Sequence, residues 1–510
     1  MKKSFKILAL LLSLVMMLSV FAACDNGSGD GDKTGDEETT TTGSGETTVS
    51  GSESNNDSNS ESDSNKGETT TKVEEVTEVM PDIDKKDYGA EFYLSVLNDT
   101  NPMDHYWVEE SNNDVLSAAL YDRQEKVKNY LGVEVLASMA GHFETYTEDL
   151  KTAVKNKSGG IDTLLTHVSS GVSGLITGAY LTPFGDLPGV DLDADYWNQD
   201  FMEALSVCDE YLLGFSDFNI LYTYVIAYNV DLLAKYDDAL NKSVYQMVDD
   251  YEWTLQQFID IAKLGHIDNG SVEKSQYGLT GQLWVPWCGF LEACGVNLVE
   301  INDKGMYEIS YMNDVYKERT QNIVTALTEL AASKEVCVDY QSVTAPKVPF
   351  ESGRALMTLT ATINVDDYLN YDIDFGVLPY PTYDTNQKEY RSLQWGGYLA
   401  VPAFLEDEEM VGETLEMLSF FSEDVKTAYY QKLLGKQIAD NPDDRRMLEI
   451  IWDSVCTDFG QTFDEISGNP LYMLPIVTSG TTSLTSFYEG RTNGGNKSII
   501  NFLKKVDKKY

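Results

Sequence analysis

The chain has 510 residues, which is long enough for two or three ordinary domains. Its 83 acidic and 37 basic residues give a formal net charge of −46. This excess argues against nucleic acid as a partner, because a nucleic-acid-binding protein needs a basic surface, and equally against broad attraction to an anionic membrane. Hydrophobic residues make up 42% of the chain, so most of it can form a sizeable core.

Residues 1–23 are predicted to be a secretory signal peptide. Three lysines stand among the first six residues, and residues 7–21 are almost continuously apolar. This apolar run of about 15 residues is shorter than the roughly 20 that a membrane-spanning helix needs, although an uncleaved anchor remains the alternative. Residues 21–24 (FAAC) resemble the lipobox of bacterial lipoproteins, with Phe21 where that family prefers Leu. The resemblance implies that Cys24 is acylated, with palmitate as one such acyl group, and becomes the mature N-terminus.

The segment that follows, residues 24–80, is predicted to be a disordered acidic tether. From residue 25 to residue 80 Ser, Thr, Gly, Asn and acids dominate, aromatic residues are missing, and acids outnumber lysines by 15 to 3. Such a composition buries too little apolar area to offset the entropy lost on ordering. A lipid at one end would therefore hold the rest of the chain just outside a membrane.

From Glu91 onward the chain alternates strand-like and helix-like patterns. Strands are predicted at 91–97, 133–137 and 161–166, and helices at 113–131 and 148–157. This βαβαβ order favours a parallel sheet covered by helices.

The second half of the chain continues the alternation. Strands are predicted at 222–228, 278–283 and 356–363, and helices at 255–263, 315–333, 408–421 and 498–506. No internal repeat is visible. A single doubly wound domain rarely needs this length, so we expect two lobes.

Five separated segments carry a resemblance to a known family. They are 228–233 (YNVDLL), 253–258 (WTLQQF), 350–357 (FESGRALM), 376–381 (GVLPYP) and 396–402 (GGYLAVP). In this order they resemble the signatures of family 1 extracellular solute-binding proteins, the receptor subunits of sugar-importing ABC transporters. Gln257 stands where that family usually has Glu. The resemblance covers about four-fifths of the chain, from about Tyr88 to the C-terminus.

The resemblance implies an α/β, two-lobed periplasmic-binding-protein-like fold of type II. Each lobe would be a sheet flanked by helices, hinge strands would join the lobes, and a ligand would lie in the cleft between them. Carried onto this sequence, lobe one is expected at residues 85–222 plus 373–415, and lobe two at residues 223–372 plus 416–510.

Catalytic and metal-binding patterns are weak. None of the four histidines stands in an HExxH motif, and nucleophile-elbow, phosphate-loop and dinucleotide-binding motifs are missing. Acidic pairs are expected by chance among 83 acids. The five cysteines other than Cys24 have no redox or zinc spacing, so free thiols are expected. The sequence therefore predicts a protein that is not an enzyme and has no cofactor and no metal site; His167, which follows a predicted strand, is expected to be structural rather than to face the cleft.

Aromatic residues are the more informative candidates, because sugars present apolar faces to flat rings and hydroxyl edges to polar side chains. Trp284 and Trp287 lie just beyond the strand predicted at 278–283, in a stretch resembling the family's sugar-stacking segment. Trp395 precedes Gly396-Gly397, and Trp107 lies in a polar loop after the first strand. The alternatives are that Trp287 packs in the core and that Trp395 packs beneath a tight turn.

Polar partners for a sugar are predicted near the chain crossings. Asp217 and Tyr222 lie near the first of them, and Thr360, Thr362 and Asn364 follow the 350–357 segment. Solvated or structural roles are the alternative for all five.

The favoured function is a lipid-anchored receptor on the outer side of the cell membrane that captures a small solute, a mono- or oligosaccharide, and delivers it to ABC permease subunits. We expect it to be a monomer, attached to the membrane through its N-terminal lipid. The alternatives are a surface polysaccharide-active enzyme and a non-transporting carbohydrate-binding adhesin or sensory lectin.

Overall fold

The computed structural model describes residues 79–97, 101–142, 145–169, 171–271, 273–281, 283–336, 349–439 and 441–510. Met80–Tyr510 forms one compact unit. The predicted signal peptide, the lipidation of Cys24 and nearly all of the tether lie outside the described residues.

Within this unit the described residues build a five-stranded sheet in the order β2-β1-β3-β12-β4. Strands β1, β2 and β3 are parallel, whereas β12 runs antiparallel to both of its neighbours, β3 and β4. The bounds are β1 Ala90–Val96, β2 Val133–Met139, β3 Thr163–Leu165, β4 Leu181–Thr182 and β12 Leu399–Pro402. We call this the first sheet.

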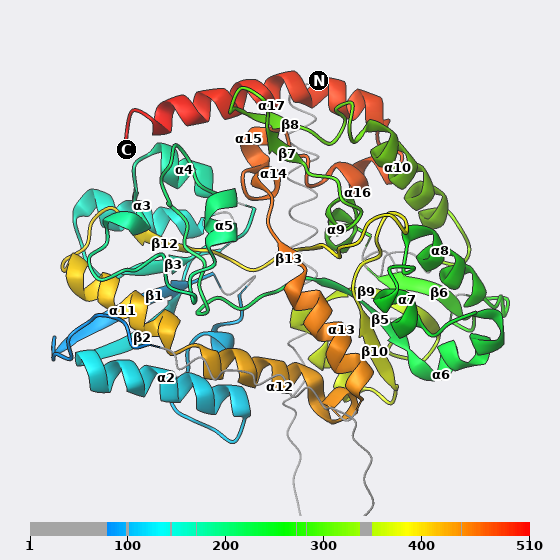
Figure 1. The fold of residues 1–510 in the computed structure, drawn as a ribbon, viewed down its shortest axis with the longest axis horizontal. Helices are drawn as coiled ribbons and strands as arrows, with labels where there is room; N and C mark the ends of the chain where they lie inside the picture. Colours follow the sequence, from blue (N-terminus) through cyan, green and yellow to red (C-terminus); the bar gives the residue numbers. More distant parts are fainter. Residues whose placement is uncertain are drawn as a thin grey trace, which may run out of the picture. The chain divides into compact units, whose positions relative to one another are not determined.

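Helices surround the first sheet in Figure 1: α2 lies below its strands, α3, α4 and α5 lie above them, and α11 runs at their left. Helix α2 begins where the Asp114 side chain accepts a hydrogen bond from the Ser117 amide and ends at Gly132, whose φ is +64°. An acidic N-cap and a left-handed glycine are the expected boundaries of a helix. The bounds are η2 Met103–His105, α2 Val115–Leu131, α3 Tyr146–Asn156, α4 Val172–Thr177, η3 Phe184–Asp186, α5 Gln199–Ala204 and α11 Glu408–Phe420.

A four-stranded sheet, the second sheet, has the order β10-β5-β9-β6 in the described chain. Strand β5 is antiparallel to β9 and β10, and β6 is parallel to β9. All residues of these strands are buried, as expected for a sheet covered on both faces. The bounds are β5 Tyr224–Asn229, β6 Tyr277–Gly281, β9 Ala355–Ala361 and β10 Phe375–Leu378.

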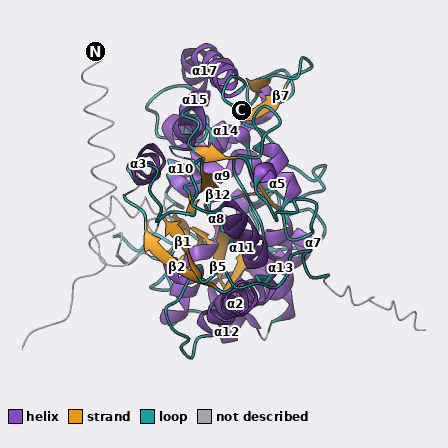
Figure 2. Ribbon diagram, turned by 90° about the vertical axis from the view of Figure 1, so that its left-hand side faces the viewer, coloured by secondary structure: helices purple, strands orange, loops and turns teal. Residues whose placement is uncertain are grey.

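Helices also surround the second sheet, whose strand β5 lies in the interior in Figure 2. Helix α8 packs closely on β6, since a Cβ on Gly278 would lie 1.5 Å from the carbonyl oxygen of Ala262. The bounds are α6 Val230–Leu233, η4 Ala234–Ala239, α7 Val244–Asp249, α8 Leu255–Leu264, α9 Val285–Ala293, α10 Lys317–Ala331, η5 Thr362–Asn364 and η6 Asp366–Asn370.

The chain passes between the two sheets three times. It enters the second sheet at β5, returns to the first at β12, and leaves again through α12 (Glu423–Ala439), which contacts both α2 and α13. The sequence prediction assigned residues 373–415 to the first lobe. Because β10 pairs with β5, however, the chain returns to the first sheet only at β12.

The C-terminal residues add helices and two small strand pairs. Helix α17 contacts α4 on the side of the first sheet as well as α15 and α16. Strand β11 pairs in parallel with β13, and β7 and β8 form an antiparallel pair. The bounds are β7 Val299–Ile301, β8 Tyr307–Ile309, β11 Ser392–Leu393, α13 Pro442–Asp453, β13 Val455–Cys456, α14 Phe459–Thr462, α15 Asp464–Ser467, α16 Met473–Thr478 and α17 Leu484–Val506.

The predicted strands and helices are confirmed within a few residues. The exception is the helix predicted at 498–506, which begins at Leu484. In the part of the chain that the structure describes, no helix combines the length and apolarity needed to cross a membrane.

Candidate functional site

One edge of each sheet lies where the chain crosses between them. In the first sheet, β1 and β3 end at this edge, and β12 begins there, with Leu399 paired to Leu165. In the second sheet β6 and β9 end, and β5 begins, at the edge that contains Tyr224, which pairs with Ala361. The crossing into β5 and the crossing toward β12 therefore join these two edges.

The two crossings run side by side and are held by backbone hydrogen bonds. Thr223 forms an antiparallel bridge with Gln394, and the Trp395 amide donates to the carbonyl oxygen of Tyr222 at 2.7 Å. On the other side, the Thr223 amide donates to Thr362 Oγ1 at 3.1 Å, and the Thr362 amide donates to the Thr223 carbonyl at 2.9 Å. Thr362 is thus part of the crossing itself.

Gly397 allows the second crossing to pack tightly against the first sheet. Its amide donates to Asn101 Oδ1 at 2.9 Å, and a Cβ at this position would lie 1.8 Å from the carbonyl oxygen of Thr166. Only glycine fits such a close approach of two backbone segments. The approach fixes the position of Trp395, two residues earlier.

Trp395 lies between aromatic side chains of the two sheets. Its ring centroid is 5.6 Å from that of His167 and 5.5 Å from that of Tyr224. The Ser169 amide donates to His167 Nδ1 at 3.0 Å. Burial lowers the pKa of His167 to about 3, so the imidazole is neutral. The half-buried indole of Trp395 is thus flanked by two uncharged rings, those of His167 and Tyr224.

A second ring pair lies beyond the end of β6. Trp284, the residue before α9, stacks on Tyr472 with centroids 5.6 Å apart and an interplanar angle of 25°. Both side chains are half-buried. Tyr472 immediately precedes α16, and nothing in the sequence around it indicated that it stacks on Trp284.

Several buried polar atoms near Trp395 have no hydrogen-bond partner among the described residues. They are both side-chain atoms of Gln394, Gln461 Oε1 and the Tyr224 hydroxyl. Gln461 Nε2 donates to the carbonyl oxygen of Gln394 at 2.5 Å, so the two glutamines are adjacent. Most buried polar groups in proteins have a partner, so these four atoms would be satisfied by a ligand or by water. No sequence motif singled out these residues, although Gln394 directly precedes Trp395.

Two of the predicted tryptophans lie elsewhere. Trp287 is fully buried, donates from Nε1 to Thr478 Oγ1 at 3.0 Å and packs edge-on against Phe290. It belongs to the core between α9 and α16, as the alternative interpretation held, because its ring leaves no surface for a solute. Trp107 is half-buried and donates from Nε1 to the carbonyl oxygen of Val135 in β2, at 2.8 Å.

The predicted polar partners are dispersed. Asp217 forms an ion pair with Lys426 at 2.8 Å, and burial raises its pKa against the effect of that lysine. The Tyr222 ring is fully buried, with its hydroxyl 2.8 Å from His105 Nδ1. Thr360 is buried inside β9, and Asn364 is exposed in η5. Of this group, Thr362 and the backbone of Tyr222 reach the crossing.

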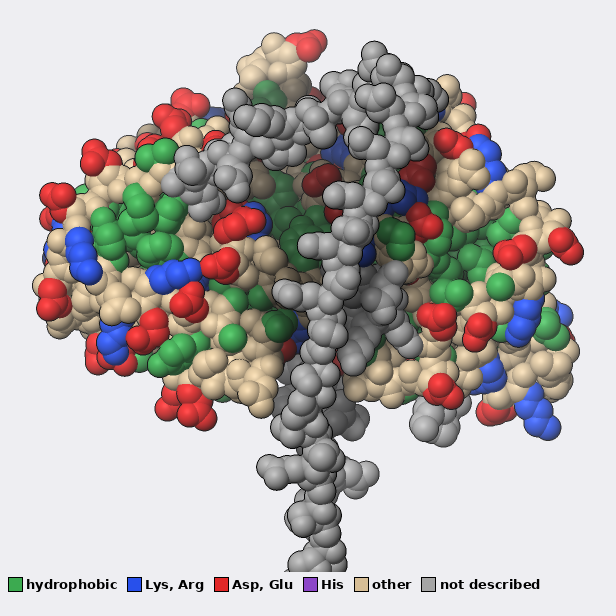
Figure 3. Space-filling view, turned by 60° about the horizontal axis from the view of Figure 1, so that its bottom comes forward, with side chains coloured by type: hydrophobic (Ala, Val, Ile, Leu, Met, Phe, Trp, Pro, Cys, Tyr) green, Lys and Arg blue, Asp and Glu red, His purple; other side chains and the backbone are tan. Residues whose placement is uncertain are grey.

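The described surface carries charges of both signs, and the described thiols are free. Figure 3 shows one face of the molecule, with Asp and Glu side chains on its left and right halves and Lys and Arg side chains among them. The four cysteines that the structure describes are free: Cys208, Cys288, Cys294 and Cys456. Among the described residues, no group of three or more His, Cys, Asp or Glu side chains is placed to hold a metal ion.

The family model described as bacterial extracellular solute-binding protein matches residues 124–436, more than half of the chain. The chain is a bacterial extracellular solute-binding protein. This confirms the predicted family. No curated protein sequence gives a significant match.

Solved structures of similar fold support the architecture of this solute-binding protein. The GacH receptor of Streptomyces glaucescens, studied with acarbose, is 15% identical, with a TM-score of 0.51 over 81% of this chain and 98% of that one. A cyclo/maltodextrin-binding protein complexed with maltotetraose is 14% identical, with a TM-score of 0.51 over 85% and 98%. An ABC substrate-binding protein from Listeria monocytogenes in complex with cycloalternan is 13% identical, with a TM-score of 0.50 over 82% and 98%. The fold is that of the type II periplasmic binding proteins, as predicted.

Proposed function

We propose that this solute-binding protein is a lipid-anchored extracellular receptor that captures a mono- or oligosaccharide between its two lobes and delivers it to an ABC permease. The observation that carries the proposal is the combination of aromatic rings and unpartnered buried polar atoms at the crossing. Trp395, which is half-buried, supplies the accessible ring. Tyr224, Gln394 and Gln461 are buried behind it, so their polar atoms would meet a ligand only when the lobes open. Similar folds that hold acarbose, maltotetraose or cycloalternan support the same ligand class.

The chemistry of a sugar matches these groups. The C–H face of a pyranose packs on an aromatic ring, and its hydroxyls both donate and accept hydrogen bonds. The amide of Gln394 offers a donor and an acceptor, and the Tyr224 hydroxyl offers both in one atom. A ligand hydroxyl that pairs with these atoms would remove the cost of leaving them unsatisfied.

Binding would close the lobes about the crossings. A ligand that contacts both lobes stabilises the closed form by its differential affinity for the two states. In the structure, Ser173 of α4 donates a hydrogen bond to Glu465 of α15, so the helices beside the first sheet already contact the C-terminal helices. The predicted monomer needs no second chain for this closure.

The test is a calorimetric titration of the protein with mono- and oligosaccharides, compared with peptides. Trp395→Ala and Trp284→Ala are expected to weaken saccharide binding by about tenfold or more, because each removes a stacking ring worth about 1–1.5 kcal/mol or more. Trp107→Phe is the control, since its indole contacts the Val135 carbonyl. If both alanine variants keep full affinity while a saccharide binds the parent, the binding site proposed here is wrong.

Two further measurements address the anchor and the delivery step. Mass spectrometry of the mature protein from its host should find a diacylated or triacylated N-terminal Cys24, and Cys24→Ser should release the protein from the membrane. Deletion of the gene should abolish uptake of the bound saccharide. Retained uptake would favour the adhesin, and release of reducing sugar from a polymer would favour the enzyme.

A further inference from the structure

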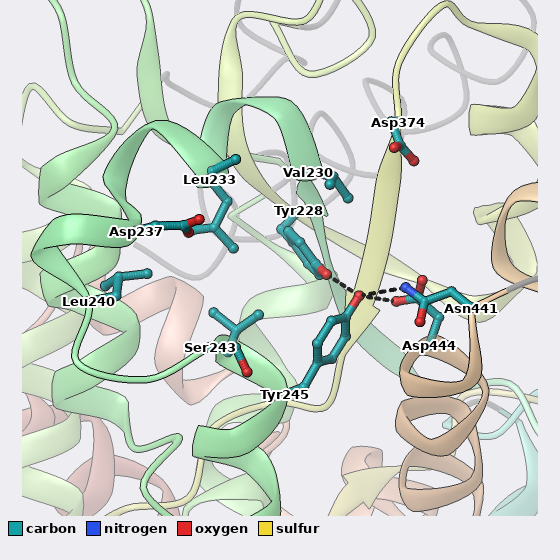
Figure 4. A pocket seen from close by; sticks show the side chains of 12 residues that line it. Tyr228, Val230, Leu233, Asp237, Leu240, Ser243, Tyr245, Asp374, Asn441 and Asp444 are labelled. Atoms are coloured by element: carbon teal, nitrogen blue, oxygen red, sulfur yellow. Dashed lines mark hydrogen bonds between the residues drawn. The ribbon is translucent and has the colours of Figure 1, made fainter.

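A cavity of about 450 Å³ lies at the outer end of the second sheet, against α6, η4, α7 and the start of α13. Figure 4 shows the side chains that surround it. They are Tyr228, Val230, Leu233, Ala234, Asp237, Leu240, Ser243, Val244, Tyr245, Asp374, Asn441 and Asp444. A volume of this size falls within the range of small-molecule sites in proteins.

This cavity is separate from the candidate saccharide site. Tyr224 begins β5 at the crossing, whereas Tyr228 lies near the other end of the same strand, paired with Met357. Four residues of extended strand span about 13 Å. The cavity therefore opens at the end of the sheet away from Trp395.

A chain of hydrogen bonds forms one wall of the cavity. Tyr228 donates to the Tyr245 hydroxyl, which donates to Asp444 Oδ1 at 2.6 Å, and Asn441 Nδ2 lies 3.3 Å from the same hydroxyl. Gly376 permits this arrangement, because a Cβ there would lie 2.6 Å from Tyr228 Oη and 2.7 Å from Asp444 Oδ1. The Asp444 side chain is thus held in place at 3% exposure.

The charge of the cavity is negative. Its carboxylates come from three elements: Asp237 from η4, Asp374 from the residue before β10, and Asp444 from α13. None of the described residues that line it is Lys, Arg or His. The nearby Arg446 is engaged by Asp249 and Asp443 instead. Burial, with a smaller effect of the neighbouring Asp374, raises the pKa of Asp444 to about 6, although Tyr245 and Asn441 donate hydrogen bonds to it.

Apolar side chains also line the cavity, namely those of Val230, Leu233, Leu240 and Val244. The three carboxylates do not converge, since no described group of acids is placed to hold a single metal ion. Separated negative charges joined by apolar surface match a ligand whose positive charges are separated by methylene groups.

We propose that this cavity binds a linear aliphatic polyamine. Its ammonium groups would pair with Asp237, Asp374 and Asp444, and its methylene chain would lie against the leucines. The site is independent of saccharide binding at the crossing and gives the protein a second ligand.

The test is a calorimetric titration of the full chain with spermidine at physiological ionic strength. Because the chain carries a net charge of −46, nonspecific attraction must be separated from the cavity. Asp237 and Asp374 are both exposed, so Asp237→Asn with Asp374→Asn should leave the fold intact. The matched control is Asp193→Asn with Asp303→Asn, which removes the same charge from exposed residues outside the cavity.

We expect one saturable site, weakened about tenfold or more by the cavity pair and unchanged within about twofold by the control pair. Ala234→Trp fills the cavity without changing its charge and should weaken binding by a similar factor. Equal losses in the two asparagine pairs, the lack of saturable binding, or full binding by Ala234→Trp would each overturn the proposal.

Discussion

Gly397 carries a large part of the geometry of the crossing. A methyl group there would meet the Thr166 carbonyl at 1.8 Å, a contact that backbone atoms cannot relieve cheaply. We expect Gly397→Ala to lower the free energy of unfolding by about 3 kcal/mol or more, through displacement of the crossing. Gly494→Ala is the control, since no atom lies within 4 Å of its Cβ, and in the exposed face of α17 it should stabilise by about 0.5–1 kcal/mol. Urea denaturation of both variants measures the difference, and equal stabilities would contradict it.

His167 is expected to stay neutral across the physiological range. Its pKa is lowered to about 3 because burial removes the ring from water and disfavours the cation. NMR of the imidazole nuclei should therefore show no titration of His167 between about pH 5 and pH 8, whereas an exposed histidine titrates near 6.5. A midpoint inside that interval would contradict the neutral environment inferred for Trp395.

At the scale of elements, Arg391 joins the crossing to α9. Arg391 is the residue just before β11. Its guanidinium pairs with Glu292 of α9 and donates to Asn297 Oδ1 at 2.8 Å. Arg391→Met would leave the Glu292 carboxylate buried and unpaired, which costs about 3–5 kcal/mol. Burial already raises the pKa of Glu292 to about 7, so the loss should shrink as the pH falls and the group is protonated. Lys263→Met, which breaks an exposed pair with Asp260, is the control and should cost less than about 1 kcal/mol.

Sequence patterns predicted the elements whose local signals agree with their burial. The helix 113–131 has an acidic cap and a terminal glycine, and the strand at 356–363 is a continuous apolar run. The lobe boundary near residue 373 was not predictable in this way, because strand pairing between β10 and β5 depends on residues far apart in sequence. For the same reason Trp395 could be singled out beside its glycines, but Tyr472 and Gln461 could not, since only tertiary packing brings them to the crossing.

For the whole molecule, buried acids make stability depend on pH in an unusual direction. Burial raises the pKa of Asp162 and Asp458 to about 6 and that of Asp464 to about 7, above the values of about 4 in the unfolded chain. Between about pH 4 and about pH 7, these acids bind more protons in the folded state than in the unfolded state, so their contribution to stability falls as the pH rises. Protonation of His167 in the unfolded chain acts in the opposite direction, because its pKa is lowered by burial, but one histidine is outweighed by the several acids. Lowering the pH from about 7.5 to about 5.5 should therefore raise the melting temperature.

The size of this effect follows from the shifts, since each pKa unit corresponds to about 1.4 kcal/mol. Reduced repulsion within a chain of net charge −46 acts in the same direction. Scanning calorimetry at the two pH values measures it. Asp464→Asn should reduce the difference, and a melting temperature that falls on acidification would contradict the prediction.

The threefold passage between the sheets also constrains the order in which the chain can fold. Strand β12 fills the place between β3 and β4, yet it follows them by more than two hundred positions and comes after the whole second sheet. An N-terminal fragment that ends before β5 would leave one edge of β3 unpaired, and such an edge recruits other chains. Closing so long a loop is slow, so the nascent chain spends its most aggregation-prone period with the first sheet incomplete. The protein therefore needs this edge of β3 to be protected while it is being made, until Leu399 has been synthesised and can pair with it.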